Sequence, residues 1–228
     1  MDILEGRVCV TAALKAKRRT FEAVLVRLGI TDESIAELLQ AAEAIGIKIQ
    51  RVREEALAAR AHGKSHGGIV AVALPLPSAP VPASMDFAVL LDGVDDARNL
   101  GYAIRSAEAF GAQAVFLRKR AMDFDGGDVS RSSSGAYERL PVILGDHVPA
   151  SLRLVACLSE AGKSLYDEDL RPPTALAIGG EKRGLSAAVR DRCKTFVTIP
   201  TVPGASSLSL SQAAAVAMAE VHRQRNKT

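Results

Sequence analysis

Three polar segments in the second half of the chain hold the residues whose types could do chemistry. In the first segment, residues 90–111, Asn99 and Arg105 stand six positions apart. That spacing puts them about 240° apart around a helix, so they would serve different ends of a site. The second segment, residues 177–186, has glycines that let a backbone approach a ligand closely. The third, residues 199–215, carries a serine-rich run before a helical pattern.

Each segment alone also has a simpler interpretation. A glycine turn after a strand is usually only a turn, and serines before a helix usually cap it. Arg105 alone would be a solvated helix charge, paired with Glu108. The order and spacing of the three segments favour a shared site.

The familiar catalytic and cofactor motifs do not occur in the sequence. It contains no P-loop, no G-x-G-x-x-G that opens a helix and no G-x-S-x-G. The four histidines lack metal-ligand spacing, so no metal site is expected. The three cysteines are widely spaced and form no C-x-x-C, which predicts a reducing cytoplasm rather than a disulfide scaffold.

The composition of the chain is typical of a globular protein. The chain has 228 residues, of which 48% are hydrophobic, and a formal charge of +3, which neither demands nor excludes a nucleic acid. Six Phe, three Tyr and no Trp argue against an aromatic platform that stacks bases. The start lacks the pattern of a signal peptide, and the two long uncharged stretches are too rich in Pro, Ser and Thr to predict membrane spans.

The elements that must position these segments fall into two parts. The prolines of residues 75–84 predict a stiff, extended linker between residues 1–74 and 85–228. The first part alternates strands and helices as a small α/β sandwich does. Its expected strands are 21–26, 47–52 and 68–74, and its expected helices are 32–45 and 54–61.

The second part has short, wholly apolar runs typical of a parallel sheet that is buried on both faces. The expected strands are 87–91, 114–117, 141–144, 154–158, 175–178 and 196–199, and the expected helices are 99–110 and about 209–222. Residues 145–152 are too few for an ordinary parallel crossover. A truncated helix or a wrong strand assignment would explain that length.

Together the three segments resemble the motifs of the SpoU-type RNA 2′-O-ribose methyltransferases of the SPOUT superfamily. The resemblance spans about residues 87–222, and its most specific part is the R-N-L-G-x-x-x-R-x-A-x-x-F-G pattern that begins at Arg98. The first part of the chain resembles the substrate-binding domain that many such enzymes carry, at residues 6–19 and 65–71.

The resemblance implies an α/β domain with a deep C-terminal trefoil knot. It also implies S-adenosylmethionine as methyl donor, and homodimers whose sites lie at the interface. The donor would lie against Gly179, Ile199 and Leu208, in a pocket that Gly180 and Gly184 help to shape. The catalytic candidates are Asn99, Arg105, Glu181 (bracing the glycine turn), Ser207 and Ser209.

The chemistry of those residue types fits methyl transfer to a ribose hydroxyl. Arg105 is no ordinary base, because a guanidinium is effectively always protonated. It could instead hold the target phosphate and stabilise developing alkoxide charge. Most relatives have Asn where this chain has Ser209, so whether Ser209 takes over that role stays open.

Residues 15–19 are the candidate RNA contact of the first part. They hold Lys15, Lys17, Arg18 and Arg19, which form either a solvated charge run or a set of phosphate ligands. The separate N-terminal domain favours ribosomal RNA over transfer RNA as substrate. The remaining hypothesis is a non-catalytic RNA-binding or ribosome-assembly protein that keeps the fold.

Overall fold

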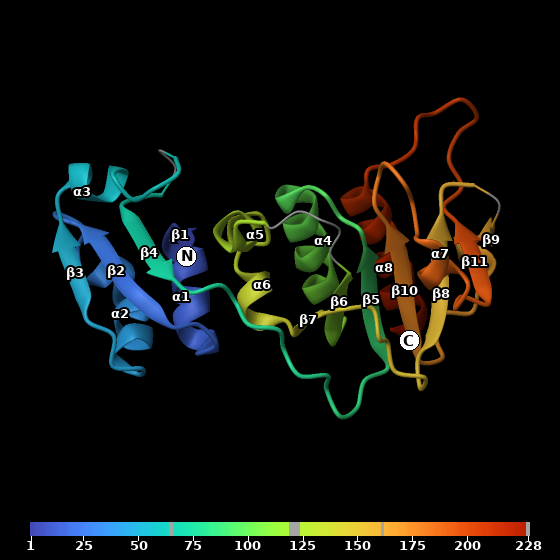
Figure 1. Ribbon diagram of the computed structural model, residues 1–228, viewed down its shortest axis with the longest axis horizontal. Coiled ribbons are helices and arrows are strands. Elements are labelled where there is room, and N and C mark those ends of the chain that lie inside the picture. Colours follow the sequence, from blue (N-terminus) through green and yellow to red (C-terminus); the bar gives the residue numbers. More distant parts are fainter. Residues whose placement is uncertain (64–65, 119–123, 161, 227–228) are drawn as a thin grey trace. The chain divides into compact units, whose positions relative to one another are not determined.

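The computed structural model describes residues 1–63, 66–118, 124–160 and 162–226. The chain forms two compact units (Figure 1). Unit 1 comprises Met1–Pro77 together with Phe124–Arg139, and unit 2 comprises Ser78–Asp123 together with Leu140–Thr228. Residue 65, where one resemblance to the substrate-binding domain begins, lies outside the described residues.

Unit 1 contains a four-stranded sheet in the order β1-β4-β2-β3. Its strands are β1 (Asp2–Glu5), β2 (Phe21–Arg27), β3 (Ile49–Val52) and β4 (Ile69–Ala73). Its N-terminal helices are α1 (Arg7–Ala16), η1 (Glu33–Ile35), α2 (Ala36–Glu43) and α3 (Glu54–Ala58). Leu14, Val24 and Leu38 from α1, β2 and α2 share one buried apolar cluster, so the helices and the sheet have a common core.

Two further helices of unit 1 come from the middle of the chain. They are α5 (Gly126–Ser132) and α6 (Ala136–Arg139), and α5 packs on β1 while α6 packs on α1. The sequence predicted neither of them. Glycine and serine, which are poor helix formers, make up four of the seven residues of α5 (GGDVSRS).

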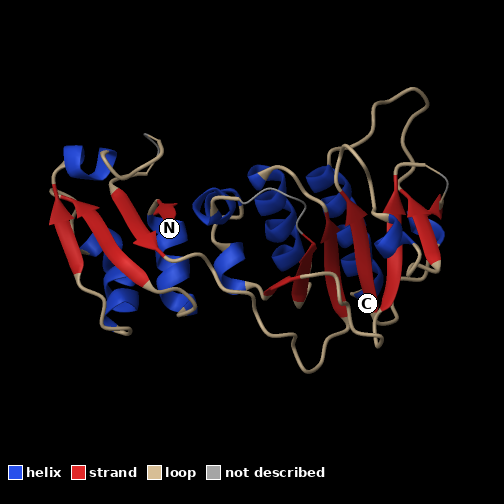
Figure 2. Cartoon of the chain, in the orientation of Figure 1, coloured by secondary structure: helices blue, strands red, loops and turns tan. Residues whose placement is uncertain are grey.

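Unit 2 is built on a seven-stranded sheet in the order β7-β6-β5-β10-β8-β11-β9, and all its pairings are parallel (Figure 2). The strands are β5 (Phe87–Asp92), β6 (Ala114–Arg118), β7 (Val142–Leu144), β8 (Arg153–Leu158), β9 (Lys163–Ser164), β10 (Thr174–Gly179) and β11 (Thr195–Thr198). The predicted α/β fold with a buried parallel sheet is confirmed.

The helices of unit 2 cover this sheet. They are α4 (Ala97–Ala109), η2 (Leu165–Asp167), α7 (Ala187–Arg190) and α8 (Leu210–Arg225). α4 packs against α8, which also packs on β10. Val189 of α7 joins alternate strand residues such as Leu90 and Phe116 in a separate buried cluster, as expected where side chains alternate across a sheet.

The short connection between β7 and β8 is explained by the strand order. β7 lies at one edge of the sheet, and three strands separate it from β8. Residues 145–152 therefore cross about 19 Å of sheet, which eight extended residues can span. Both predicted strands exist and residues 145–152 hold no helix, so neither a truncated helix nor a wrong strand assignment explains the short connection.

Candidate active site

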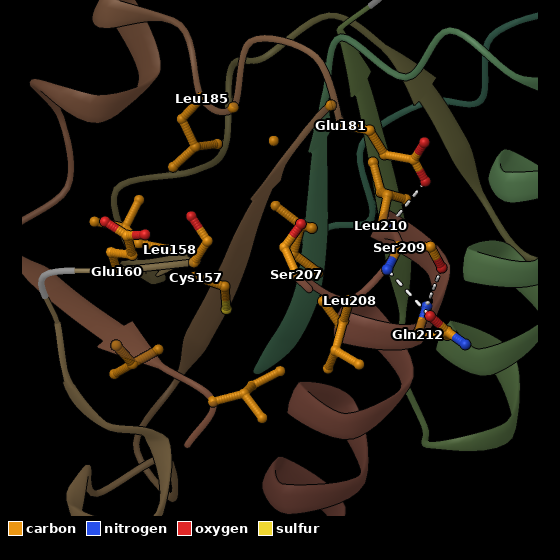
Figure 3. A pocket seen from close by; sticks show the side chains of 18 of the residues that line it. Cys157, Leu158, Glu160, Glu181, Leu185, Ser207, Leu208, Ser209, Leu210 and Gln212 are labelled. Carbon is orange, nitrogen blue, oxygen red and sulfur yellow. Dashed lines mark hydrogen bonds between the residues drawn. The ribbon is translucent and has the colours of Figure 1, made fainter. Parts of the chain in front are cut away.

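A cavity of about 800 Å³ opens where β8, β10 and β11 end (Figure 3). Loops that follow parallel strands meet at the same edge of a sheet, which is where α/β proteins bind ligands. The second and third polar segments both contribute to the lining, with Gly179, Gly180, Glu181, Gly184, Ile199, Ser207, Leu208 and Ser209. The structure thus gathers every residue expected to hold the donor.

The glycine turn after β10 packs backbone directly on backbone. Gly180 N–H donates to Asp92 O over 2.9 Å, and Gly184 N–H donates to Gly180 O over 2.8 Å. A Cβ on Gly180 would lie 2.2 Å from Gly93 O, and one on Gly179 would lie 2.2 Å from the Gly184 carbonyl carbon. Neither position can take a larger residue unless the backbone moves.

Asp92 anchors the exit of this turn. Its carboxylate is fully buried, accepts from Ser186 N–H over 2.6 Å and pairs with Arg118 over 3.0 Å. Burial alone would raise the pKa of Asp92, but the hydrogen bonds from Ser186 and Arg118 outweigh it and lower that pKa. Asp92 was not among the site residues predicted from the sequence, although a lone Asp at the end of an apolar strand indicates a buried carboxylate with hydrogen-bond partners.

Glu181 links the three polar segments. Its Oε1 accepts from the Asn99 side-chain amide over 2.9 Å and from Leu210 N–H, at the start of α8, over 3.2 Å. Ser211 Oγ donates to Asn99 Oδ1 over 2.9 Å. A carboxylate at the N-terminus of a helix also meets the positive end of the helix dipole. The network fixes the glycine turn to α4 and α8.

The two serines of the third segment have different surroundings. Ser209 is the N-cap of α8: its Oγ accepts from Gln212 N–H, and its own N–H donates to the Gln212 side chain (Figure 3). Asn and Ser are equally good N-caps, so local structure tolerates either residue here. Ser207 lines the cavity and has no hydrogen-bond partner among the described residues, which leaves its hydroxyl available to a ligand.

Arg105 is not brought to this cavity within one chain. It is exposed on α4, it does not line the cavity, and it has no ion-pair or hydrogen-bond partner in the part of the chain that the structure describes. Asn99, on a different face of α4, points to Glu181 instead. Asn99 and Arg105 therefore lie on different faces of α4, as their six-residue spacing predicted.

The thiols of Cys157 and Cys193 are unsuited to act as nucleophiles. Burial raises the pKa of Cys157, which lines the cavity, to about 12, and that of Cys193 to about 11. Both side chains stay protonated at neutral pH. The described residues also include no cluster of three His, Cys, Asp or Glu side chains that could hold a metal ion.

The basic residues 15–19 of unit 1 do not form one exposed set of possible phosphate ligands. Arg19 is buried and forms ion pairs with Asp2 and Glu138, so it is not a surface ligand for phosphate. Arg18 donates to Glu138 O, and Lys15 pairs with Glu37 at the surface. Lys17 alone of the four is exposed without a partner among the described residues. The sequence of residues 15–19 alone could not predict that carboxylates far away in the chain pair with these basic side chains.

No described helix is long and apolar enough to cross a membrane.

Comparisons with known proteins agree with these features. Residues 86–219 match the SpoU rRNA Methylase family, and residues 3–79 match the family described as RNA 2′-O ribose methyltransferase substrate binding. The chain is 33% identical over 242 residues to the 23S rRNA (guanosine-2′-O-)-methyltransferase RlmB of Photorhabdus laumondii, covering 99% of both chains. It is also 33% identical over 244 residues to RlmB of Shewanella oneidensis, covering 98% of both.

A solved structure shares the fold over both units. The SpoU methyltransferase AviRb of Streptomyces viridochromogenes, in complex with AdoMet, matches with a TM-score of 0.81 and 25% identity over 98% of this chain and 90% of that one. The family match covers more than half of the chain and includes all three polar segments. This chain belongs to the SpoU rRNA methylase family.

Proposed function

We propose that this protein transfers a methyl group from S-adenosylmethionine to a ribose 2′-hydroxyl of 23S rRNA, at a guanosine. The observation that carries the proposal is the single cavity at which the second and third polar segments meet, with Glu181 joining them to the first. The relatives' printed activity supplies the substrate. Such a substrate makes the cytoplasm the expected compartment.

The cavity suits the donor in size and chemistry. Its volume lies within the range of small-molecule sites. Ile178, Val197 and Ile199 provide apolar wall for an adenine ring, and the glycine turn offers bare backbone for hydrogen bonds. Glu160 and Arg183 put both signs of charge on the lining, which matches the charged amino and carboxylate groups of the donor.

When bound, S-adenosylmethionine supplies a methyl group activated by its sulfonium. The residues of the chain must align the ribose oxygen with that methyl group, and good alignment can contribute several kcal/mol, about 7–11 in well-oriented reactions. Arg105 suits the charge that develops on the oxygen as it loses its proton, since its planar fork binds phosphate or alkoxide. Ser207 lines the cavity, which supports a role for its hydroxyl in hydrogen-bonding the reactants.

A second copy of the chain completes the site. Arg105 is exposed and does not line the cavity of its own chain. Tyr102, one turn away on α4, is 49% exposed, and the partly exposed Val216 and Ala219 give α8 an apolar surface. We infer a homodimer through α4 and α8 that brings Arg105 to the partner's cavity, as the family resemblance implies.

Unit 1 supplies the RNA contact. Its match to the substrate-binding family covers residues 3–79, and Lys17 offers an exposed positive charge. Lys15 could exchange its exposed partner Glu37 for a phosphate at little cost, because surface ion pairs contribute about 0–1 kcal/mol. RNA affinity should therefore fall as salt rises.

The alternative of a non-catalytic RNA-binding protein was motivated by Ser209, and the structure gives Ser209 another role. Ser209 stands where the family resemblance implies Asn, but its side chain serves as the N-cap of α8, a role that either residue fills. Transfer RNA remains the alternative substrate, and the full-length match to rRNA enzymes favours 23S rRNA.

Calorimetry with S-adenosylmethionine, followed by methyl transfer to a 23S rRNA transcript and to bulk tRNA, tests the proposal. We expect donor binding and an alkali-resistant dinucleotide, the mark of 2′-O-methylation, in 23S rRNA alone. A protein that binds no donor, or that methylates a base, would contradict the proposal.

A further inference from the structure

Asp92 lies where three neighbouring strands of unit 2 end. It is the last residue of β5, and it is in register with Gly179 on β10 and with Arg118 on β6. Gly179 leads into the glycine turn and lines the cavity, whereas Arg118 does not line it. Asp92 therefore connects the wall of the cavity with a charged side chain outside it.

Asp92 holds the glycine turn at both ends. Its backbone oxygen accepts from Gly180 N–H over 2.9 Å, and its Oδ2 accepts from Ser186 N–H over 2.6 Å. Most residues between these two bonds line the cavity, namely Glu181, Arg183, Gly184 and Leu185. A displaced Asp92 side chain would release the exit of the turn and thereby alter the cavity wall.

Arg118 compensates the charge of this carboxylate. The Asp92 side chain is 0% exposed, and a buried charge without a partner is costly. Arg118 Nη1 lies 3.0 Å from Asp92 Oδ1, and among the described residues no other side chain forms an ion pair with Asp92. The charged side chains of the turn are placed elsewhere: Glu181 and Arg183 line the cavity, and Lys182 pairs with Asp95. Without Arg118, burial would raise the pKa of Asp92.

Arg118 is also held from its other side. Its Nε lies 3.5 Å from Asp146 Oδ2, in the connection that follows β7, and Arg192 Nη1 donates to Asp146 O over 2.7 Å. Ser186 is the N-cap of α7, and Arg192 lies two residues beyond the end of that helix. The contacts therefore run from one end of α7 through Asp92 and Arg118 back to its other end. A planar guanidinium between two carboxylates fixes this path.

We propose that Arg118 is a positioning residue for the donor cavity: it compensates the buried charge of Asp92, whose two acceptors hold the glycine turn in the shape that binds S-adenosylmethionine. In this role Arg118 contacts neither the donor nor the ribose. The part of the inference that concerns the donor rests on the proposed function, whereas the part that concerns the turn does not.

Arg118→Met in the full-length protein removes the charge and keeps a long side chain. We expect its Kd for S-adenosylmethionine, measured by calorimetry, to rise about fivefold or more between about pH 7.5 and about pH 5.5, because the buried Asp92 then takes up a proton. The Kd of the wild-type protein should change less than about twofold over that range, because the lowered pKa of Asp92 keeps it ionised.

The double variant Arg118→Met/Asp92→Asn separates charge compensation from packing. It has no buried charge to compensate and no proton to take up at residue 92, so the pH dependence of the Kd should disappear. Arg171→Gln is the matched control, since Arg171 is an exposed arginine that pairs with Asp169. It should leave the Kd unchanged at every pH. If Arg118→Met does not fold, Arg118→Gln can still donate to Asp92 without a charge and should show the same pH trend.

Amide hydrogen exchange in residues 180–186 reports on the turn in the absence of donor. At equal pH, Arg118→Met should exchange about tenfold faster there than the wild-type protein, because the turn opens locally. The double variant should exchange more slowly than Arg118→Met, since it removes the uncompensated charge.

Wild-type donor affinity and wild-type exchange in the charge-free variants of Arg118 would overturn the proposal. A loss of affinity that is equal at every pH and persists in the double variant would also overturn it, because Arg118 would then act through packing alone. A wild-type protein that binds no donor would defeat the proposed function, and the exchange result would still decide whether Arg118 positions the turn.

Discussion

Arg105 is the single residue on which the proposed methyl transfer depends most. It is a free, exposed guanidinium on α4, and no other interaction among the described residues accounts for it. We expect Arg105→Ala to lower methyl transfer by about 100-fold or more, the size of effect seen when one stabilising donor is removed. Donor affinity measured by calorimetry should stay near wild type, because Arg105 does not line the cavity of its own chain.

Arg105→Lys is the sharper variant. A point charge does not replace a planar fork, so transfer should remain strongly impaired. Turnover near the wild-type rate in either variant would remove Arg105 from the reaction.

Asp92 should make unit 2 less stable as the pH falls into the acid range. Its pKa is lowered in the folded state, so its contribution is present above the unfolded value of about 3.9 and is lost as pH falls through the folded value. Asp92→Ala would leave the Ser186 N–H unsatisfied and should cost about 1–3 kcal/mol near neutral pH. The stabilities of the two proteins in denaturant melts should converge as pH falls through the lowered folded pKa of Asp92. A constant gap across that range would show that the Asp92 charge is unimportant.

At the scale of elements, the start of α8 is held by a capping box. Ser209→Ala removes the cap and should destabilise unit 2 by about 1 kcal/mol, whereas Ser209→Asn should be nearly neutral. Methyl transfer by Ser209→Asn should match wild type, because the position asks for an N-cap. A large gain in rate with Asn would mean that the amide has a chemical role that Ser fills poorly.

The sequence predicted most elements of unit 2 because short apolar strands and an amphipathic helix have strong local patterns. The residues that it predicts as donor contacts all line one cavity, because they belong to loops that follow parallel strands. It missed β1 and α1. It also missed α5, whose glycines and serines favour no helix, and α6, which is only four residues long. The role of Arg19 was beyond its reach, since Glu138 lies 119 positions away.

At the scale of the whole molecule, the proposed homodimer can be tested by complementation. Arg105→Ala and Glu181→Ala each disable one contributor to a site, and we place these contributors on different copies. Random mixing of the two inactive proteins should then restore about a quarter of wild-type activity, since half of the dimers would hold one intact site of two. Mixtures that stay inactive while sedimentation shows exchanged dimers would place Arg105 in the site of its own chain.

Mapping of ribose methylation in cells tests whether this chain 2′-O-methylates a guanosine of 23S rRNA. RNA from cells that lack the protein should miss one 2′-O-methylguanosine in 23S rRNA, and the wild-type gene should restore it while Arg105→Ala should not. If every ribose methyl group in ribosomal and transfer RNA survives the deletion, the claim is contradicted.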